Sequence, residues 1–487
     1  MSLKAFGSRR SLVLLVAAIL VVSTGLAYAA APRPNIVLCI ADDWGWPHAS
    51  AYGDAVVKTP AFDRVAREGV LFANAFVSSP SCTPSRGALI TGQHFWRLAE
   101  GANLHSVWPV GRFAEYPQLL AEAGYHVGTY RKAWGPGRGS PGGKPYKSVD
   151  AFFESRPADA PFCFWFGTSD PHRPYEKGSG ERSGMDLSRV HLYPHYPDAP
   201  EVRGDVADYY FEIQRFDREV GELMARLAAL GELDKTLFVI TSDHGMPFPR
   251  GKTNLYDCGV HVPLAIRWPD RVPGGRTVTD LVSLTDLAPT FLAAAGLAVP
   301  PQMTGHGLLA LLERGKAGRV EAARDHVLFG RERHTPAQEA PNGGGYPMRA
   351  IRTDDFLYIR NLAPDRWPSG TPDYTHAFFQ QAWLSDCDNG PTKKYMWDHR
   401  EEPAVRDLYA LSFAKRPAEE LYDLRQDPNE LHNVADEPKY AQAKAELSER
   451  LTAELRSTAD PRIVGGGEQF DKYPYLGGGG GQWNKTD

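Results

Sequence analysis

The chain has 487 residues, of which 42% are hydrophobic and 23% are charged, enough for one large domain or two unequal ones. Its formal net charge of −5 excludes the broad basic surface by which proteins bind nucleic acid, so we expect no nucleic-acid partner. A polyanionic ligand would need cations that are gathered at one site.

The first 29 residues have the pattern of an export signal. Three basic residues precede an apolar segment at 11–26, and residues 27–29 (Ala-Tyr-Ala) form a typical cleavage site. The pattern predicts cleavage after Ala29 and a periplasmic or secreted protein. Loss of the three basic residues would bring the net charge from −5 to −8. An uncleaved membrane anchor is the alternative, but the apolar run is short for a membrane span, so we expect no stable anchor.

The first predicted strand, residues 35–41, is a continuous apolar run that is typical of a buried parallel strand. It is followed at once by Asp42 and Asp43. Two adjacent carboxylates in a crevice cost free energy unless a cation balances them, and ligands of open α/β sheets bind at this edge. A solvated turn is the alternative. We interpret the pair as candidate metal ligands.

After a predicted helix at 59–69 and a predicted strand at 70–76, the segment 81–93 reads S-C-T-P-S-R-G-A-L-I-T-G-Q. Pro84 suits a first helical turn, and a helix that starts there would place Arg86 one turn from Cys82 on the same face. Cys82 would lie at a helix N-terminus, which favours a negative ligand, and Arg86 suits a tetrahedral oxyanion. The alternatives are a buried thiol and an ordinary thiol nucleophile.

Two further predicted strands end in polar residues. Residues 127–130, after a predicted helix at 117–124, lead into Lys132 and Trp134, and residues 161–167 lead into Asp170-Pro171-His172-Arg173. A histidine just past a central strand can donate a proton to a leaving group. A loop histidine that caps a turn is the alternative.

A predicted amphipathic helix at 205–230 precedes another central strand, residues 236–241, and then Asp243 and His244. Carboxylates from two strand ends would converge, and such hard oxygen ligands favour calcium or magnesium over zinc. Lys252 follows Asp243 by nine residues in a loop that contains Gly and Pro. This position fits an anion-binding loop, with a surface lysine as the alternative.

In combination, these motifs resemble the type I sulfatases. The resemblance rests on Asp42-Asp43, C-T-P-S-R with L-I-T-G, Asp170-Pro171-His172, Asp243-His244-Gly245 and Lys252, in family order, and it extends from Asn35 to roughly Asn433. The loop at 246–259 and Tyr346-Pro-Met-Arg349 are similar to the sulfamidase (heparan N-sulfatase) branch.

The resemblance implies an α/β fold, an alkaline-phosphatase-like sandwich with a mainly parallel central sheet and a smaller antiparallel C-terminal subdomain. The predicted boundaries are 33–345 for the catalytic domain and 346–487 for the C-terminal subdomain with its Gly-rich tail. Within the latter, residues 349–353 and 356–361 are predicted to form a hairpin.

The resemblance also implies the chemistry. A separate formylglycine-generating enzyme would oxidise Cys82 to formylglycine, whose hydrated aldehyde attacks the sulfur of a sulfated carbohydrate. One Ca²⁺ ion would be held by Asp42, Asp43, Asp243, His244 and residue 82. Arg86, Lys132 and Lys252 would neutralise the sulfate, and His172 would protonate the leaving atom.

One motif departs from the family pattern. The family commonly has G-K-x-H-x-G where this chain has Arg131-Lys132-Ala133-Trp134-Gly135-Pro136, so Trp134 stands in place of a histidine. Trp134 could form an aromatic wall for a sugar ring. His94 and His105 are candidate replacements for the histidine. We predict that Trp134, His105 and Arg173 bind substrate.

Rival functions remain at this stage. A phosphatase or phosphonate hydrolase of the same superfold would share the carboxylates but commonly uses Ser or Thr as nucleophile, often with two zinc ions. A non-catalytic relative would bind sulfated glycans without turnover. Within the sulfatases, the sequence leaves open an N-sulfoglucosamine sulfohydrolase (sulfamidase) and an enzyme for O-sulfated glycosaminoglycan or polysaccharide.

Overall fold

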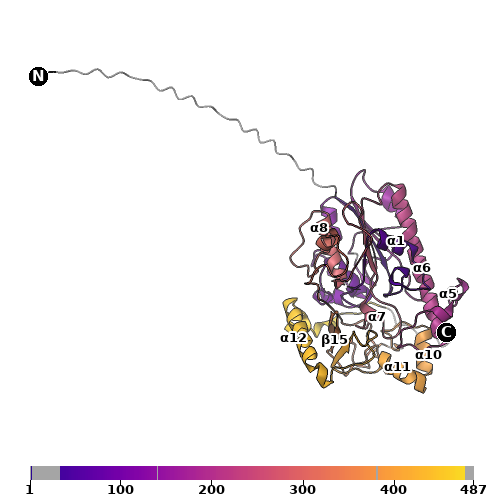
Figure 1. Cartoon of the computed structure of the whole chain (residues 1–487). Helices are drawn as coiled ribbons and strands as arrows, with labels where there is room; N and C mark the ends of the chain where they lie inside the picture. The colour runs from indigo at the N-terminus through magenta and orange to yellow at the C-terminus, as the bar shows by residue number, and fades with distance from the viewer. Residues whose placement is uncertain (1, 3–32, 140, 380–381, 478–487) are drawn as a thin grey trace. The chain divides into compact units, whose positions relative to one another are not determined.

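The computed structural model describes residues 2, 33–139, 141–379 and 382–477, and the described residues from Arg33 onward belong to one compact unit (Figure 1). The predicted export signal, apart from residue 2, lies outside the described residues. Among the helices of the described part, none is both long and apolar enough to span a membrane.

The central sheet has eight strands in the order β11-β2-β10-β9-β1-β8-β5-β7. One of its two middle strands, β1, pairs in parallel with β8 and β9, whereas β10 runs antiparallel to β9 and β2. The predicted mainly parallel sheet is confirmed. The strands are β1 (Asn35–Ala41), β2 (Val70–Phe72), β5 (His126–Tyr130), β7 (Lys144–Tyr146), β8 (Phe162–Gly167), β9 (Thr236–Ser242), β10 (Leu264–Arg267) and β11 (Arg276–Val278).

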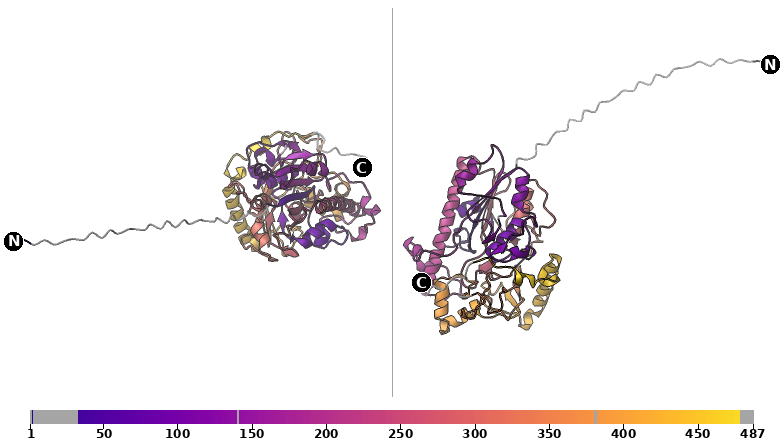
Figure 2. Two further views of the ribbon diagram at one scale, coloured as in Figure 1. Left: turned by 90° about the horizontal axis from the view of Figure 1, so that it is seen from above. Right: turned by 180° about the vertical axis from the view of Figure 1, so that it is seen from behind.

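Helices cover both faces of this sheet, as Figure 1 and the view from behind in Figure 2 show. On one side α1 (Pro60–Glu68) packs against α6 (Pro200–Ala229), and on the other α3 (Tyr116–Glu122) packs against α8 (Leu287–Ala294). Helix α6 begins earlier than predicted because Pro200 supplies a favourable first helical residue.

A second sheet of four antiparallel strands follows, with α12 (Ala441–Ser457) packed on two of them. The strands are β13 (His326–Arg331), β14 (Met348–Thr353), β15 (Phe356–Asn361) and β16 (Glu419–Asp423). The predicted hairpin at 349–361 is confirmed as β14 and β15. Strand β13 lies before the predicted boundary between residues 345 and 346, so the small sheet contains strands from both predicted domains. The division into two domains stays a prediction.

The remaining elements are short. Two-stranded pairs join β3 (Ala75–Phe76) to β12 (Val282–Ser283) and β4 (Ser106–Val107) to β6 (Gly137–Arg138). The other helices are α2 (Cys82–Thr91), α4 (Val149–Glu154), α5 (Ser179–Arg182), α7 (Asp257–Val260), α9 (Leu309–Glu313), α10 (Pro391–Asp398), α11 (Pro403–Phe413), α13 (Pro461–Val464) and α14 (Gln469–Lys472).

Candidate active site

The acidic strand ends meet at one edge of the central sheet. Strands β1 and β9 run in parallel with Ala41 opposite Ser242, so the residues that follow each strand emerge side by side. Asp43 turns back with a φ of 76°, and its backbone N–H donates to Asp243 Oδ1 at 3.0 Å. Asp42, Asp43 and Asp243 are all buried. Three carboxylates therefore share one small, buried volume.

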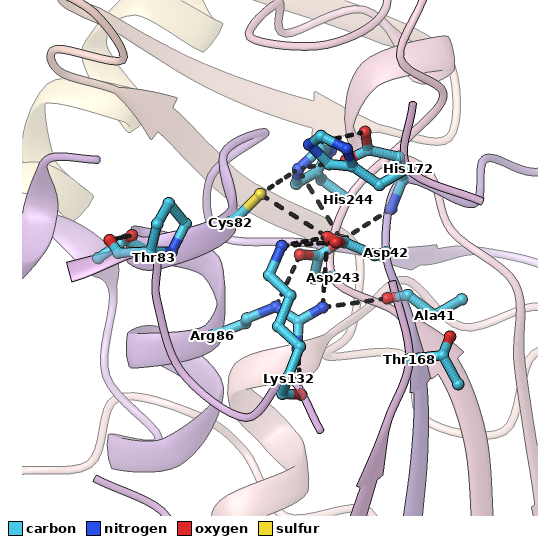
Figure 3. A network of polar contacts seen from close by, with 12 residues as sticks. Ala41, Asp42, Cys82, Thr83, Arg86, Lys132, Thr168, His172, Asp243 and His244 are labelled. Atoms are coloured by element: carbon cyan, nitrogen blue, oxygen red, sulfur yellow. Dashed lines mark hydrogen bonds and ion pairs between the residues drawn. The ribbon is translucent and has the colours of Figure 1, made fainter. Parts of the chain in front are cut away.

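Helix α2 points its first residue at these carboxylates (Figure 3). Cys82 Sγ lies 3.3 Å from His244 Nε2 and 3.8 Å from Asp42 Oδ1. One turn further along, Arg86 Nε donates to Asp243 Oδ2 at 2.7 Å, and its Nη2 lies 3.4 Å from Asp42 Oδ1. The structure thus brings Cys82 and Arg86 to the same side of the helix, as the C-x-P-x-R spacing predicts.

Two lysines complete the cationic side of the site. Lys132 Nζ donates to both oxygens of Asp42, each at 2.6 Å. Lys252 Nζ donates to Asp43 Oδ2 and to Asp388 Oδ2, each at 2.8 Å. Burial alone would lower the pKa of Lys252, but the Asp388 and Asp43 carboxylates raise it well above its ordinary value. Both lysines are charged at neutral pH.

His172 lies at the more open side of the site, with 35% of its side chain exposed. Its Nδ1 lies 2.6 Å from the Arg173 carbonyl oxygen, which can only accept a hydrogen bond, so Nδ1 carries a hydrogen. Its Nε2 lies 4.0 Å from Asp43 Oδ2. Any proton that His172 transfers must therefore leave from Nε2.

The acidic residues fit a metal ion. Asp43 Oδ1 lies 2.9 Å from His244 Nε2, yet this buried oxygen accepts no hydrogen bond. A carboxylate oxygen and an imidazole nitrogen this close together can bind one cation. Two sets of residues here could hold a metal ion, and Cys82 belongs to each. One set adds Asp43 and His244, and the other adds Asp42 and Asp243.

The pKa directions show how strongly these buried charged groups act on one another. Burial would raise the pKa of Asp243, but the Arg86 guanidinium and the His244 ring hold it far below its usual range. Burial would lower the pKa of His244, but the Asp243 and Asp43 carboxylates raise it well above its ordinary value. The pKa of Asp42 is raised, because burial outweighs the attraction of Lys132.

The three residues predicted to bind substrate have other contacts. Arg173 makes a two-pronged ion pair with Asp205 at 2.8 and 2.7 Å. The Trp134 ring packs 5.3 Å from Trp108, and its indole nitrogen is buried without a hydrogen-bond partner. His105 packs against a tyrosine ring, and burial and the charge of Lys132 lower its pKa. Their substrate contacts stay predictions.

His94, the other candidate for the missing histidine, stacks on Trp96 with ring centroids 4.3 Å apart. Burial lowers its pKa to about 3, so the ring is neutral. These contacts make His94 a packing residue of the region around Trp96.

Sequence reasoning missed two residues of the site. Asp388 shares the Lys252 ammonium with Asp43. His334 is buried, and its Nδ1 lies 2.8 Å from the hydroxyl of Ser81, the residue that precedes Cys82. Both come from the irregular segments around the small sheet, and neither lies in a motif, so no signal in a single sequence marks them.

Comparisons with known proteins decide the family. A model of the sulfatase family matches residues 34–140 and 145–297, and a model of the C-terminal region of N-sulphoglucosamine sulphohydrolase matches residues 248–362. Human N-sulphoglucosamine sulphohydrolase is 30% identical over 491 residues, which cover 89% of this chain and 92% of the human protein. The chain belongs to the sulfatase family.

Other relatives are similar to this sulfatase in sequence or in fold. An ulvan-active sulfatase of Formosa agariphila is 28% identical, covering 89% of the chain and 82% of the relative. The solved structure of BT4656 with its substrate D-glucosamine-2-N,6-O-disulfate has a TM-score of 0.64 at 20% identity, covering 88% of this chain and 98% of that one. A phosphonate monoester hydrolase of Agrobacterium radiobacter has a TM-score of 0.60 at 21% identity, covering 89% and 97%. The predicted alkaline-phosphatase-like fold is confirmed.

Proposed function

We propose that this sulfatase removes sulfate groups from sulfated carbohydrate through a formylglycine derived from Cys82. The observation that carries the proposal is the position of Cys82. Its sulfur lies at a buried helix N-terminus, between ligands suited to a cation and beside Arg86, with two lysines bound to the same carboxylates. The named substrates of the relatives, N-sulphoglucosamine and ulvan among them, support a sugar sulfate.

Two groups would complete the site. Asp42, Asp43, Asp243 and His244, together with residue 82, would hold a calcium ion, which would neutralise the carboxylates and polarise a sulfate oxygen. The formylglycine would supply a hydrated aldehyde as the oxygen nucleophile. A formylglycine-generating enzyme is therefore the proposed maturation partner.

The chain's own residues bind and orient the sulfate. Lys132 and Lys252 bring two ammonium groups to the carboxylate cluster, where they can neutralise sulfate oxygens. Arg86 holds Asp243 in place and is itself fixed by the carbonyl oxygens of Lys132 and Ala133, at 3.1 and 2.9 Å. A guanidinium with this many fixed partners costs little reorganisation when charge develops nearby.

His172 is the proposed proton donor to the leaving atom. Because the Arg173 carbonyl fixes the hydrogen on Nδ1, the protonated ring offers Nε2–H to the substrate. His172 is also partly exposed, on the side from which a sugar can approach. The leader pattern supports a periplasmic or secreted location for this reaction.

The test is sulfate release by protein that is produced together with a formylglycine-generating enzyme. We expect release from sulfated glucosamine by the wild type and none by Cys82→Ala, which should remain folded because Ala fits the small buried site. Retention of the sugar by the wild type without sulfate release would contradict the proposal and favour a binding role. Equal release by Cys82→Ala would also overturn it.

A further inference from the structure

Asp388 lies where the site opens toward solvent. Its side chain is 23% exposed, whereas that of Asp43, the other partner of Lys252, is fully buried. The other open residues of the site are His172 and Lys132, with side chains 35% and 21% exposed. The body of a substrate must approach past these three side chains, so Asp388 can contact it directly.

Hydrogen bonds from neighbouring residues hold the backbone around Asp388 in place. The ammonium of Lys393, on α10, donates to the carbonyl oxygens of Leu384 and Cys387 and to Asn389 Oδ1, at 2.9, 2.8 and 2.9 Å. On the other side, Thr392 donates through its hydroxyl to Asp205 at 2.7 Å. Hydrogen bonds on both sides of Asp388 fix its backbone, so its carboxylate is preorganised rather than flexible.

The spacing of Asp388 and His172 suits one bound atom between them. A carboxylate oxygen of Asp388, a ring nitrogen of His172 and a carboxylate oxygen of Asp43 all lie within 4.8 Å of one another, and His172 Nε2 lies 4.0 Å from Asp43 Oδ2. Two hydrogen bonds of about 2.8 Å that meet at a tetrahedral atom put their outer atoms about 4.6 Å apart. A single substrate atom can therefore interact with His172 Nε2 and with Asp388 at once.

His172 and Asp388 require two different chemical properties of that substrate atom. His172 donates a proton to it, so the atom must have a free electron pair when its bond to sulfur breaks. Asp388 is paired with Lys252 and ionised, so it only accepts hydrogen bonds, and the atom must also carry a hydrogen. The nitrogen of a sulfamate meets both demands. The bridging oxygen of a sulfate ester carries no hydrogen and would face the carboxylate as a second acceptor.

We propose that Asp388 determines specificity by accepting a hydrogen bond from the leaving nitrogen of a sulfamate, and so favours N-sulfated over O-sulfated sugars. The inference rests on the proposed sulfatase reaction. As sulfur passes to the oxygen nucleophile at residue 82, the S–N bond breaks and its electron pair stays on nitrogen. That nitrogen takes the proton from His172 Nε2 and leaves as an amine, while its original N–H remains bonded to Asp388.

The test compares glucosamine N-sulfate with glucosamine 6-O-sulfate as substrates of matured wild type, Asp388→Ala and Asp388→Asn. A hydrogen bond to a charged group predicts that Asp388→Ala lowers kcat/KM for the N-sulfate about 10- to 100-fold. Both substrates lose the Asp388 contact with Lys252, but the loss for the ester should be at least about threefold smaller, because its leaving oxygen has no hydrogen to donate. Asp388→Asn should recover part of the loss, because its amide oxygen still accepts. The matched control is Asp398→Ala, an exposed carboxylate on α10, which should alter neither value.

Each contrary outcome is distinct. An equal loss for both substrates would assign Asp388 to the support of Lys252 alone and overturn the inference. Sulfate release by the wild type from the ester only would also overturn it and leave the sulfatase proposal intact. Release from neither sugar by protein with a matured residue 82 would overturn the inference, and the sulfatase proposal would then be tested on ulvan, which a relative's name gives as substrate.

Discussion

The contacts of the Asp43 carboxylate are the best structural evidence for a cation site. It is fully buried and bonds to Lys252 through one oxygen, while its other oxygen lies against His244 without a hydrogen bond. A buried carboxylate oxygen without a partner is costly, and a divalent cation would satisfy it. The calcium hypothesis is thus argued from this oxygen, independently of the family resemblance.

We expect calcium to stabilise the folded protein. A ligand that binds only the folded state adds about 2.7 kcal/mol to the free energy of unfolding at a hundred times its Kd. Thermal unfolding with calcium and with a chelator measures this difference, and chelation should also abolish sulfate release. Asp43→Asn should lose the calcium-dependent shift, whereas Asp186→Asn, in an exposed loop, should keep it. No calcium-dependent shift in the wild type would contradict the assignment.

At the scale of elements, the fully buried helix α2 and the partly solvated helix α6 each contain a glycine, and the two glycines differ in the space around them. A Cβ added at Gly87 of α2 would come within 3.0 Å of the side chains of Leu98 and Trp108. A Cβ at Gly204 of α6 would meet nothing within 4 Å. The small residue in α2 is therefore needed for packing, and the one in α6 is not.

The same substitution should have opposite signs in the two helices. Gly204→Ala should raise the free energy of unfolding by about 0.5–1 kcal/mol, because alanine costs less backbone entropy in a helix. Gly87→Ala should lower it by about 1–3 kcal/mol through overpacking. Urea unfolding measures both, and equal effects would show that α2 can shift to make room.

The elements that carry the site were predictable because their signals are local. Apolar runs that end in Asp42 and Asp243 predicted two parallel strands with acidic ends, and the C-x-P-x-R spacing predicted the helix with Cys82 and Arg86 on one face. Asp388 was not predictable, because its contact with Lys252 joins segments 136 residues apart. For Trp134, the sequence identified an unusual position but could not show that the ring packs beside Trp108.

At the scale of the whole molecule, the site depends on both predicted domains. Lys252 from the first contacts Asp388 from the second, and β13 pairs across the predicted boundary with β14. Strands on the two sides of the predicted boundary therefore belong to one small sheet, and the described residues from Arg33 onward belong to one compact unit.

Stability should fall in acid because of buried neutral histidines. His48 is packed among three tyrosine rings, and neither of its ring nitrogens has a hydrogen-bond partner. Burial lowers its pKa from 6.5 to about 4, with His191 adding to the effect and Asp54 opposing it. Its contribution is complete above the pKa of the unfolded chain and is lost as the pH falls toward 4, about 1.4 kcal/mol per pH unit.

Replacement of this ring tests the argument. Over the window from pH 6.5 to 4, we expect the free energy of unfolding of the wild type to fall about 3 kcal/mol more than that of His48→Phe. His432→Phe, at a position whose side chain is 80% exposed, is the control and should follow the wild type. Parallel pH profiles for His48→Phe and the wild type would show that His48 is already protonated in the folded state.

The central claim is that Cys82 acts as formylglycine, and the most direct measurement is the mass of the tryptic peptide Glu68–Arg86 from active protein. We expect the peptide to carry an aldehyde in place of the thiol, in a fraction that rises in proportion to sulfate release across preparations. Fully active protein that yields only the thiol peptide would contradict the account and leave Cys82 as an ordinary thiol.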